Sequence, residues 1–186
     1  MSIAAVRLAT VDDAADIARI QADTWRTAYA DIVGPAAIEG LDQAELERHW
    51  AGAIEHSGTD VHLATEGEFA VGFCVAGPAP AEEVAGADGT VPDDATSTGL
   101  IATVLVEPRW GRRGHGGRLL SAAASGLRAR GCDRGITWVA QADSASLAFY
   151  RHAGWHPDNT VRTLDTGERT VLELRLRGGL ELRLSD

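Results

Sequence analysis

The stretch at residues 99–131 constrains the fold more than any other part of the sequence. Residues 99–106 are apolar and rich in Ile, Val and Leu, as is typical of a strand buried on both faces. Pro108 ends this strand, and a glycine-rich turn follows at residues 111–117. A helix comes next, because apolar residues recur on one face at Leu119, Leu120, Ala123, Ala124 and Leu127. The sequence therefore predicts a strand, a tight turn and a helix, with Gly131 as the helix C-cap.

Further strands and helices are expected on both sides of this unit. Strands are predicted at residues 6–9, 61–65, 69–76, 135–140 and 169–176. Helices begin after Thr10 and Asp42, which are typical N-cap residues, and a third spans residues 144–153. A turn is expected at residues 161–168. In the strand that follows it, the residues predicted to share one face are Thr170, Leu172, Leu174 and Leu176. This order of elements predicts an α/β fold with a mixed sheet.

Residues 77–98 separate two predicted strands and differ in composition from the rest of the chain. They are rich in Pro, Gly and Ala and contain five acidic residues and no basic one. We expect a flexible, solvated loop within one domain, because strands lie on both sides. A chain of 186 residues fits a single domain, 1–186, whose residues 177–186 form a C-terminal extension.

Composition argues against several kinds of binding site and partner. The formal net charge is −10, so a nucleic-acid partner is not expected, and all 17 basic residues are Arg. A cationic substrate fits this charge better, although many acidic proteins are simply soluble. Cys74 and Cys132 predict no disulfide framework and no metal site, and we expect them to be inert buried thiols. No apolar run is long enough for a membrane span and no secretory signal is visible, so a cytoplasmic location is expected.

The glycine-rich turn has the features of an anion site. Gly114, Gly116 and Gly117 let the backbone turn tightly and expose its amides at a helix N-terminus, where the dipole favours negative charge. Arg112 and Arg113 add positive charge beside them. The pattern lacks the Gly-Lys-Ser/Thr ending of a Walker loop and the third glycine of a dinucleotide fingerprint. A diphosphate cradle is therefore predicted, in place of an ordinary turn.

Two motifs in this order resemble the GNAT superfamily of acyl-CoA N-acyltransferases. Residues 111–116 resemble the family's Gln/Arg-x-x-Gly-x-Gly/Ala motif, with Gly111 at the first position and Arg112 beside it. Residues 143–155 resemble its Asn-x-x-Ala-x-x-x-Tyr-x-x-x-Gly-Phe segment. In that segment Tyr150, Gly154 and Trp155 fit, whereas Asp143 stands for Asn and Ser146 for Ala. Residues 6–13 and 25–29 resemble the family's N-terminal region.

The resemblance implies a fold and a cofactor site. The fold is an α+β arrangement with a mixed, mostly antiparallel, twisted sheet of about six to seven strands and about four helices. The cosubstrate is acetyl-CoA, without a metal. The strand is expected to pair with the pantetheine arm, and a bulge in it can free an amide to polarise the thioester carbonyl. The residues expected to contact the cofactor are Val104, Leu105, Val106, Arg112, Arg113, Gly114, His115, Gly116, Gly117, Asp143 and Tyr150.

The resemblance also implies the chemistry. Tyr150 is expected to protonate the leaving thiolate, although an aromatic residue on a helix can also be a packing residue. Trp25 and Tyr29 are expected either beside the acceptor or in the core, and the His115 side chain is expected in solvent. Many family members carry a Glu on the strand before the glycine turn, but residues 100–103 hold no acid. The candidates for the base are then Glu107, His62, Asp143 or a chain of waters.

The predicted function is N-acetylation of a primary amine by direct attack. The acceptor is a small cationic amine, or an amine of a peptide or protein. The alternative is a non-catalytic domain that senses acyl-CoA. No membrane partner is expected, and the protein is a monomer or a homodimer. In the tail, Leu180, Leu182 and Leu184 alternate, so it is either an intramolecular edge strand or a strand that pairs with a second subunit.

Overall fold

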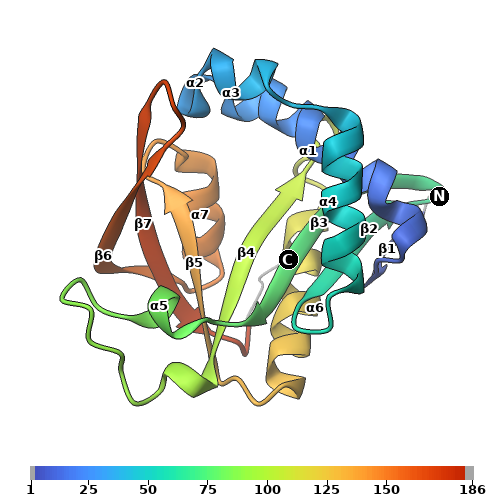
Figure 1. Ribbon diagram of the computed structural model, residues 1–186. Coiled ribbons are helices and arrows are strands. Elements are labelled where there is room, and N and C mark those ends of the chain that lie inside the picture. Colours follow the sequence, from blue (N-terminus) through green and yellow to red (C-terminus); the bar gives the residue numbers. More distant parts are fainter. Residues whose placement is uncertain (1–2, 183–186) are drawn as a thin grey trace.

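The computed structural model describes residues 3–182, in which a seven-stranded sheet forms the centre of the molecule (Figure 1). Across the sheet the strand order is β1-β2-β3-β4-β5-β7-β6. The strands are β1 (Ala4–Leu8), β2 (Asp60–Glu66), β3 (Phe69–Pro78), β4 (Thr98–Val106), β5 (Arg134–Ala140), β6 (His156–Asp165) and β7 (Thr170–Gly179). All neighbours pair antiparallel except β4 and β5, which are parallel. The predicted mixed, mostly antiparallel sheet of six to seven strands is confirmed.

Four longer helices and three short ones accompany the sheet in the described residues. The longer helices are α1 (Ala14–Thr24), α4 (Gln43–Glu55), α6 (His115–Ala129) and α7 (Ser144–His152). The short ones are α2 (Ala30–Val33), α3 (Pro35–Glu39) and α5 (Ala81–Val84). Asp42 caps α4 as predicted, since its Oδ1 accepts a hydrogen bond from the Glu45 amide at 2.7 Å. No helix in residues 3–182 is long and apolar enough to cross a membrane.

Helices cover both faces of the sheet, and the strands alternate between them. In β2, Leu63 packs in a cluster with Ile17 and Ile20 of α1, whereas the next residue, Ala64, packs in a cluster with Leu119 of α6. Both clusters consist of buried apolar side chains, so β2 and β3 are buried on both faces. The core therefore consists of two layers, one on each side of the sheet.

The sheet opens between its two parallel strands. β4 and β5 pair only at Thr98↔Arg134, Gly99↔Gly135 and Leu100↔Ile136. The register between β3 and β4 shifts at the next step, which leaves Ala102 as the extra residue of a β-bulge. Beyond it the two strands diverge (Figure 1). The remainder of β4 therefore has a strand on one side only, which creates a gap in the middle of the sheet.

Strand β6 was not predicted, and part of it falls where a turn was expected. Residues 161–165 are paired with β7, and the turn lies at residues 166–169 instead. β6 is an edge strand that is mostly exposed, so it lacks the apolar alternation of a half-buried strand. Asn159, at a φ of 68° within a register shift, interrupts the pattern further.

The expected apolar face of β7 is only partly correct. Leu176 is buried, but Leu172 is exposed, whereas Val171 and Arg175 on the opposite face are buried. The reason is that the opposite face of β7 lines the gap in the sheet and binds the segment that follows β3.

The segment at residues 77–98 is not the solvated loop that the sequence predicts. It contains α5 and a 3₁₀ turn at Ala95–Ser97, and it buries Val84 and Ala95 against Ile136 of β5. Its acids pair with distant arginines: Asp94 with Arg134 and Arg177, and Glu83 with Arg162. A run of acids without a base looks solvated in the sequence because the basic partners lie on β5, β6 and β7.

The first part of the tail belongs to the sheet. Arg177, Gly178 and Gly179 extend β7 and pair with β5. Leu180 is buried and Leu182 packs against the core, whereas Leu184 lies outside the described residues. The intramolecular strand is thus the correct alternative for residues 177–179.

Candidate active site

The gap between β4 and β5 holds a cavity of about 420 Å³. Its walls come mainly from β4, β5, β7, the start of α7, the π-helical turn at Trp25–Tyr29 that follows α1, and α2. Six of the residues predicted for the site line it: Trp25, Tyr29, Val104, Leu105, Asp143 and Tyr150. These residues are up to 125 positions apart in the chain, and the divergence of the two strands brings them together. We call this cavity the central cleft.

One wall of the central cleft is the open edge of β4. Val104 pairs with Cys74 of β3 on one side and has no partner in β5 on the other. A bulge of the kind that the resemblance implies is present in β4, at Ala102, and Ala102 also lines the cleft. An unpaired strand edge presents backbone amides and carbonyls at regular spacing, which suits an extended ligand with amide groups of its own.

Tyr150 reaches the cleft from α7. Its side chain is only 4% exposed and packs between the rings of Phe149 and Trp155, at centroid distances of 5.1 and 5.5 Å. Burial raises the pKa of the Tyr150 phenol above its ordinary value, while a hydrogen bond with the Thr137 hydroxyl opposes this shift. The phenol is therefore protonated at neutral pH and can act as a proton donor.

Asp143 is committed to the start of α7. Its Oδ1 accepts a hydrogen bond from the Ser146 amide at 3.0 Å, as an N-cap does. Tyr29 lies beside Asp143 and Ser146, and burial raises the pKa of Tyr29 to about 12. Trp25 and Tyr29 bound a π-helical turn, a form that often marks functional sites.

The glycine turn forms the start of α6. Gly114 is its N-cap, with a φ of +79° that few residues other than glycine adopt. A side chain at Gly116 would meet the ring of Phe149 at 3.2 Å, so this glycine lets α6 begin close to α7. The amides of residues 115–117 lie in the first turn of α6 and do not take part in its α-helical bonds. The turn thus has the geometry of an anion site.

The side chains of Arg113 and His115 point elsewhere, because both bind Glu66 at the end of β2. The Arg113 guanidinium lies 3.0 Å from Glu66 Oε1 and stacks on Trp110 at 4.9 Å. His115 Nε2 lies 2.8 Å from Glu66 Oε2, and the ring is 1% exposed, so the expected solvated side chain is wrong. These bonds lower the pKa of Glu66, with His115 as the largest cause.

Arg118 is a residue of the turn that sequence reasoning missed. It lies in the first turn of α6, and its guanidinium donates a hydrogen bond to the Arg113 carbonyl at 2.9 Å. Its Nη1 is also within 3.2 Å of the place where a side chain on Gly114 would stand. Its position, one helical turn after Gly114 and directly after Gly117, was the signal that could have found it.

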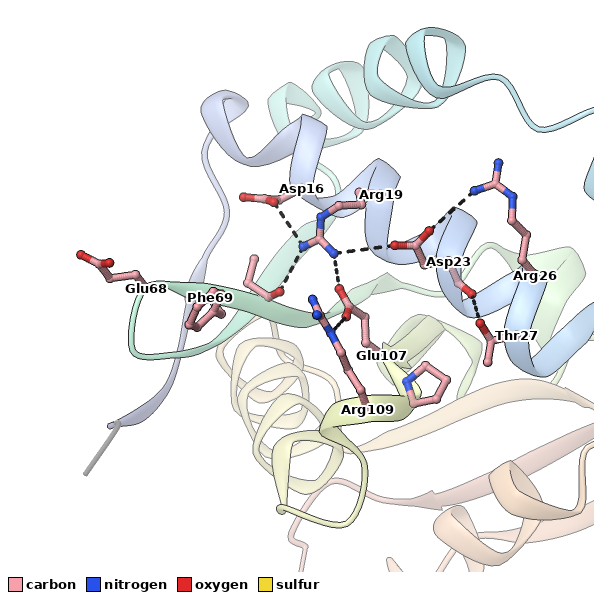
Figure 2. Close-up of a pocket in the computed structure, with 11 residues that line it drawn as sticks. Asp16, Arg19, Asp23, Arg26, Thr27, Glu68, Phe69, Glu107 and Arg109 are labelled. Carbon is pink, nitrogen blue, oxygen red and sulfur yellow. Dashed lines mark hydrogen bonds and ion pairs between the residues drawn. The ribbon is translucent and has the colours of Figure 1, made fainter.

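Two of the three candidate bases lie away from the central cleft. His62 is buried on the α6 side near Gly126, where burial lowers its pKa. Glu107 is 3% exposed and lines a separate groove of about 720 Å³, where Arg19 and Arg109 bind its carboxylate (Figure 2). Only Asp143 of the three lines the cleft.

Glu173 is an acid of the central cleft that the sequence did not suggest. It lies on β7, and its Oε2 accepts a hydrogen bond from Arg162 Nε at 2.6 Å. The signal was its position two residues after Val171, which is buried on the same face of the strand.

Known proteins share both the sequence pattern and the fold. Residues 16–155 match the acetyltransferase (GNAT) family. The chain is 32% identical to the uncharacterized N-acetyltransferase YuaI of Bacillus subtilis strain 168 over 147 residues, which cover 78% of this chain and 76% of that protein.

Two solved structures illustrate the likeness in fold. PaiA N-acetyltransferase from Thermoplasma acidophilum, in complex with coenzyme A, has a TM-score of 0.73 at 14% identity and covers 95% of this chain and 99% of its own. YncA from Salmonella typhimurium, with its cofactor acetyl-CoA, has a TM-score of 0.69 at 18% identity and covers 98% of this chain and 96% of its own. The first structure holds coenzyme A and the second holds acetyl-CoA, the cosubstrate that the family resemblance implies. The match over residues 16–155, on a sheet that opens between β4 and β5, shows that the chain belongs to the acetyltransferase (GNAT) family.

Proposed function

We propose that this protein transfers the acetyl group of acetyl-CoA to a primary amine that binds in the central cleft. The observation that carries the proposal is the position of Tyr150. This buried phenol lines a cleft whose other wall is the open edge of β4, at the end of the strand that leads into the glycine turn. Family membership and the coenzyme A bound to PaiA support the same cosubstrate.

The residues present fit this cosubstrate. At Gly116 α6 approaches α7 closely, because a side chain at this position would stand 3.2 Å from the Phe149 ring. Glycine is also typical of places where the backbone approaches a ligand. The amides of residues 115–117 would hold the diphosphate, with Arg112 and Arg118 beside them. The backbone of residues 104–106 would hold the pantetheine arm. Arg113 and His115 would act on the turn through Glu66 and not on the phosphates directly.

The residues of the central cleft supply the groups that acetyl transfer needs. Acetyl-CoA supplies the thioester whose acetyl group is transferred. The bulge at Ala102 would offer a backbone amide as the donor to a polarised carbonyl oxygen. The Tyr150 hydroxyl holds the proton that a leaving group needs. Asp143 or water would accept the proton of the attacking amine, because Asp143 is the one predicted base that lines the cleft.

The alternative, a domain that binds acyl-CoA without turnover, predicts a different result in one experiment. The purified protein is mixed with acetyl-CoA and a panel of primary amines, and free thiol is measured. We expect thiol release above background hydrolysis, and a Tyr150→Phe variant that releases it more slowly while binding CoA normally in calorimetry. Thermal stabilisation by acetyl-CoA without thiol release for any amine would support the sensor instead. No stabilisation and no release would contradict both.

We also propose that the protein is cytoplasmic and is either a monomer or a homodimer. Cys74 and Cys132 are free and buried, and burial raises the pKa of both thiols, so neither is suited to redox chemistry. Two free thiols fit the reducing cytoplasm, which fractionation of cells would test. The choice between a monomer and a homodimer would be tested by analytical ultracentrifugation.

A further inference from the structure

The central cleft carries negative charge. The residues that line it include two carboxylates, Asp143 and Glu173, and no Arg, Lys or His. The other lining residues are apolar, aromatic or hydroxyl-bearing. A cation in the cleft would therefore meet favourable charge and no positive side chain in its walls.

The two carboxylates differ in their hydrogen-bond partners. Asp143 is used as the cap of α7, and Tyr29 lies against it. Glu173 bonds through Oε2 to Arg162, but its Oε1 has no hydrogen-bond partner in residues 3–182. Arg162 does not neutralise Glu173 fully, because its guanidinium also binds Glu83 at 3.1 Å. One arginine thus serves two glutamates, and this trio keeps one net negative charge.

The position of Glu173 is fixed. Arg162 stacks on the Trp138 ring at 4.3 Å, and the Trp138 indole donates a hydrogen bond to Glu83 at 2.6 Å. The Glu173 side chain is 14% exposed, so a bond to its free oxygen would be only weakly screened by water. A carboxylate held in this way is prepared for a charged donor at low cost in side-chain entropy.

The other walls favour an apolar body on the acceptor. Trp25, Tyr29 and Trp138 line the same cleft as Leu164 and Val171. Aromatic faces attract an ammonium group and bury apolar surface. An acceptor that carries a carboxylate next to its amine would meet Glu173 and Asp143 with the wrong charge.

We propose that Glu173 is the residue that selects the acceptor, and that the acceptor is a small primary ammonium ion with an apolar or aromatic body and no adjacent carboxylate. This inference rests on the proposed acetyl transfer. The free Oε1 of Glu173 binds the ammonium group, and the aromatic walls bind the body. Glu173 is a specificity residue here, since the proton donor is Tyr150.

The test compares 2-phenylethylamine with L-phenylalanine, which differ by one carboxylate. We expect the wild-type protein to acetylate 2-phenylethylamine with a kcat/KM at least about ten-fold higher. Glu173→Gln should raise the KM for 2-phenylethylamine about ten-fold or more while the KM for acetyl-CoA changes by less than about two-fold. Glu173→Asp, which keeps the charge, should restore part of the loss. Glu47→Gln, which removes the same charge from the exposed side of α4, is the matched control.

The outcomes separate the inference from the proposed function. An unchanged KM in Glu173→Gln, or equal use of L-phenylalanine, would overturn the role of Glu173 while the enzyme remains an acetyltransferase. If no amine is acetylated, the proposed function fails, and calorimetry of 2-phenylethylamine with the CoA-loaded protein decides the inference. Binding by the wild type that Glu173→Gln loses would support it, and equal binding or none would overturn it.

Discussion

The hydroxyl of Thr137 donates a hydrogen bond of 2.7 Å to the carbonyl of Ile101, one residue beyond the last pair between β4 and β5. The bond is buried and lies directly before the bulge at Ala102. Thr137 also lies close enough to Tyr150 to lower the pKa of its phenol, against the effect of burial. This one side chain therefore links the point where the sheet opens to the phenol in the cleft.

Thr137→Val should destabilise the protein, because it leaves the buried Ile101 carbonyl without its partner. The expected loss is about 1–3 kcal/mol in the free energy of unfolding, measured by urea denaturation. Thr163→Val on the exposed edge strand β6 is the control and should change stability little. Equal effects of the two substitutions would show that the Thr137 bond contributes nothing particular.

The pH dependence of turnover tests the state of Tyr150. Burial raises the pKa of this phenol, so its protonated form persists to higher pH than that of an exposed tyrosine. We expect no loss of kcat from phenol ionisation between pH 8 and about 10, the ordinary pKa. Tyr150→Phe should lower kcat roughly 10²-fold across the same range. A fall of wild-type kcat near pH 9 that the variant lacks would contradict this assignment.

Glu66→Gln should weaken the binding of CoA, although Glu66 itself is not expected to contact the cofactor. The carboxylate binds both Arg113 and His115, so its loss frees two residues of the glycine turn at once. We expect the Kd for CoA, measured by calorimetry, to rise about three- to ten-fold. Glu68→Gln removes a charge two residues away on the exposed side of the hairpin, and its Kd should stay unchanged.

Asp13 predicts a stability change in acid. Two bonds from the Arg7 guanidinium, at 2.7 and 2.8 Å, are the main cause that lowers the pKa of Asp13 to about 2. The folded state thus binds this proton less tightly than the unfolded state, and the stabilisation is present above about pH 4 and lost towards pH 2. Asp13→Asn should cost at most about 2 kcal/mol at pH 7, because solvent screens the half-exposed Arg7.

The measurement is urea denaturation of the wild type and Asp13→Asn at pH 7 and pH 3. The difference between them should shrink at the lower pH. Asp12→Asn, at the exposed neighbouring position of the same turn, should show the same difference from the wild type at both pH values. A constant difference at both values would contradict the role of the Arg7–Asp13 pair.

Arg175→Gln should release the segment after β3. The buried guanidinium donates to the carbonyls of Glu83 and Ala85 at 2.9 and 2.7 Å and binds Asp158 at 2.7 Å. Its loss should cost at least about 2 kcal/mol and make residues 86–93 sensitive to limited proteolysis. Arg128→Gln on the exposed side of α6 should leave both properties unchanged.

The sequence predicts best the part of the fold whose signals lie close together in the chain. The β4–α6 unit combines an apolar run, a proline, glycines and a 3.6-residue period, all within about thirty residues. The same unit contains the motif that resembles the family. The cleft residues on β4 follow from this unit, whereas those at α7 follow from the second motif, at residues 143–155.

What the sequence did not predict depends on pairs that are far apart in the chain. Glu66 binds His115 across 49 positions, and Arg175 binds the carbonyl of Glu83 across 92. No local pattern signals such a pair, so His115 looked solvated and residues 77–98 looked free. Glu173 was not predicted as a site residue for the same reason, because it faces a cleft that several strands and helices form together.

The segment between β3 and β4 leaves and re-enters one half of the sheet but attaches to the other. Its ends belong to β3 and β4, whereas Arg134, Arg162, Arg175 and Arg177, which bind it, belong to β5, β6 and β7. Only three residue pairs of the backbone ladder join β4 to β5, beside the Thr137–Ile101 bond. This segment consequently ties the two halves of the sheet together and should help to set the angle at which they diverge. A relative with a tight hairpin between β3 and β4 would need other contacts between the two halves of the sheet to keep the same angle.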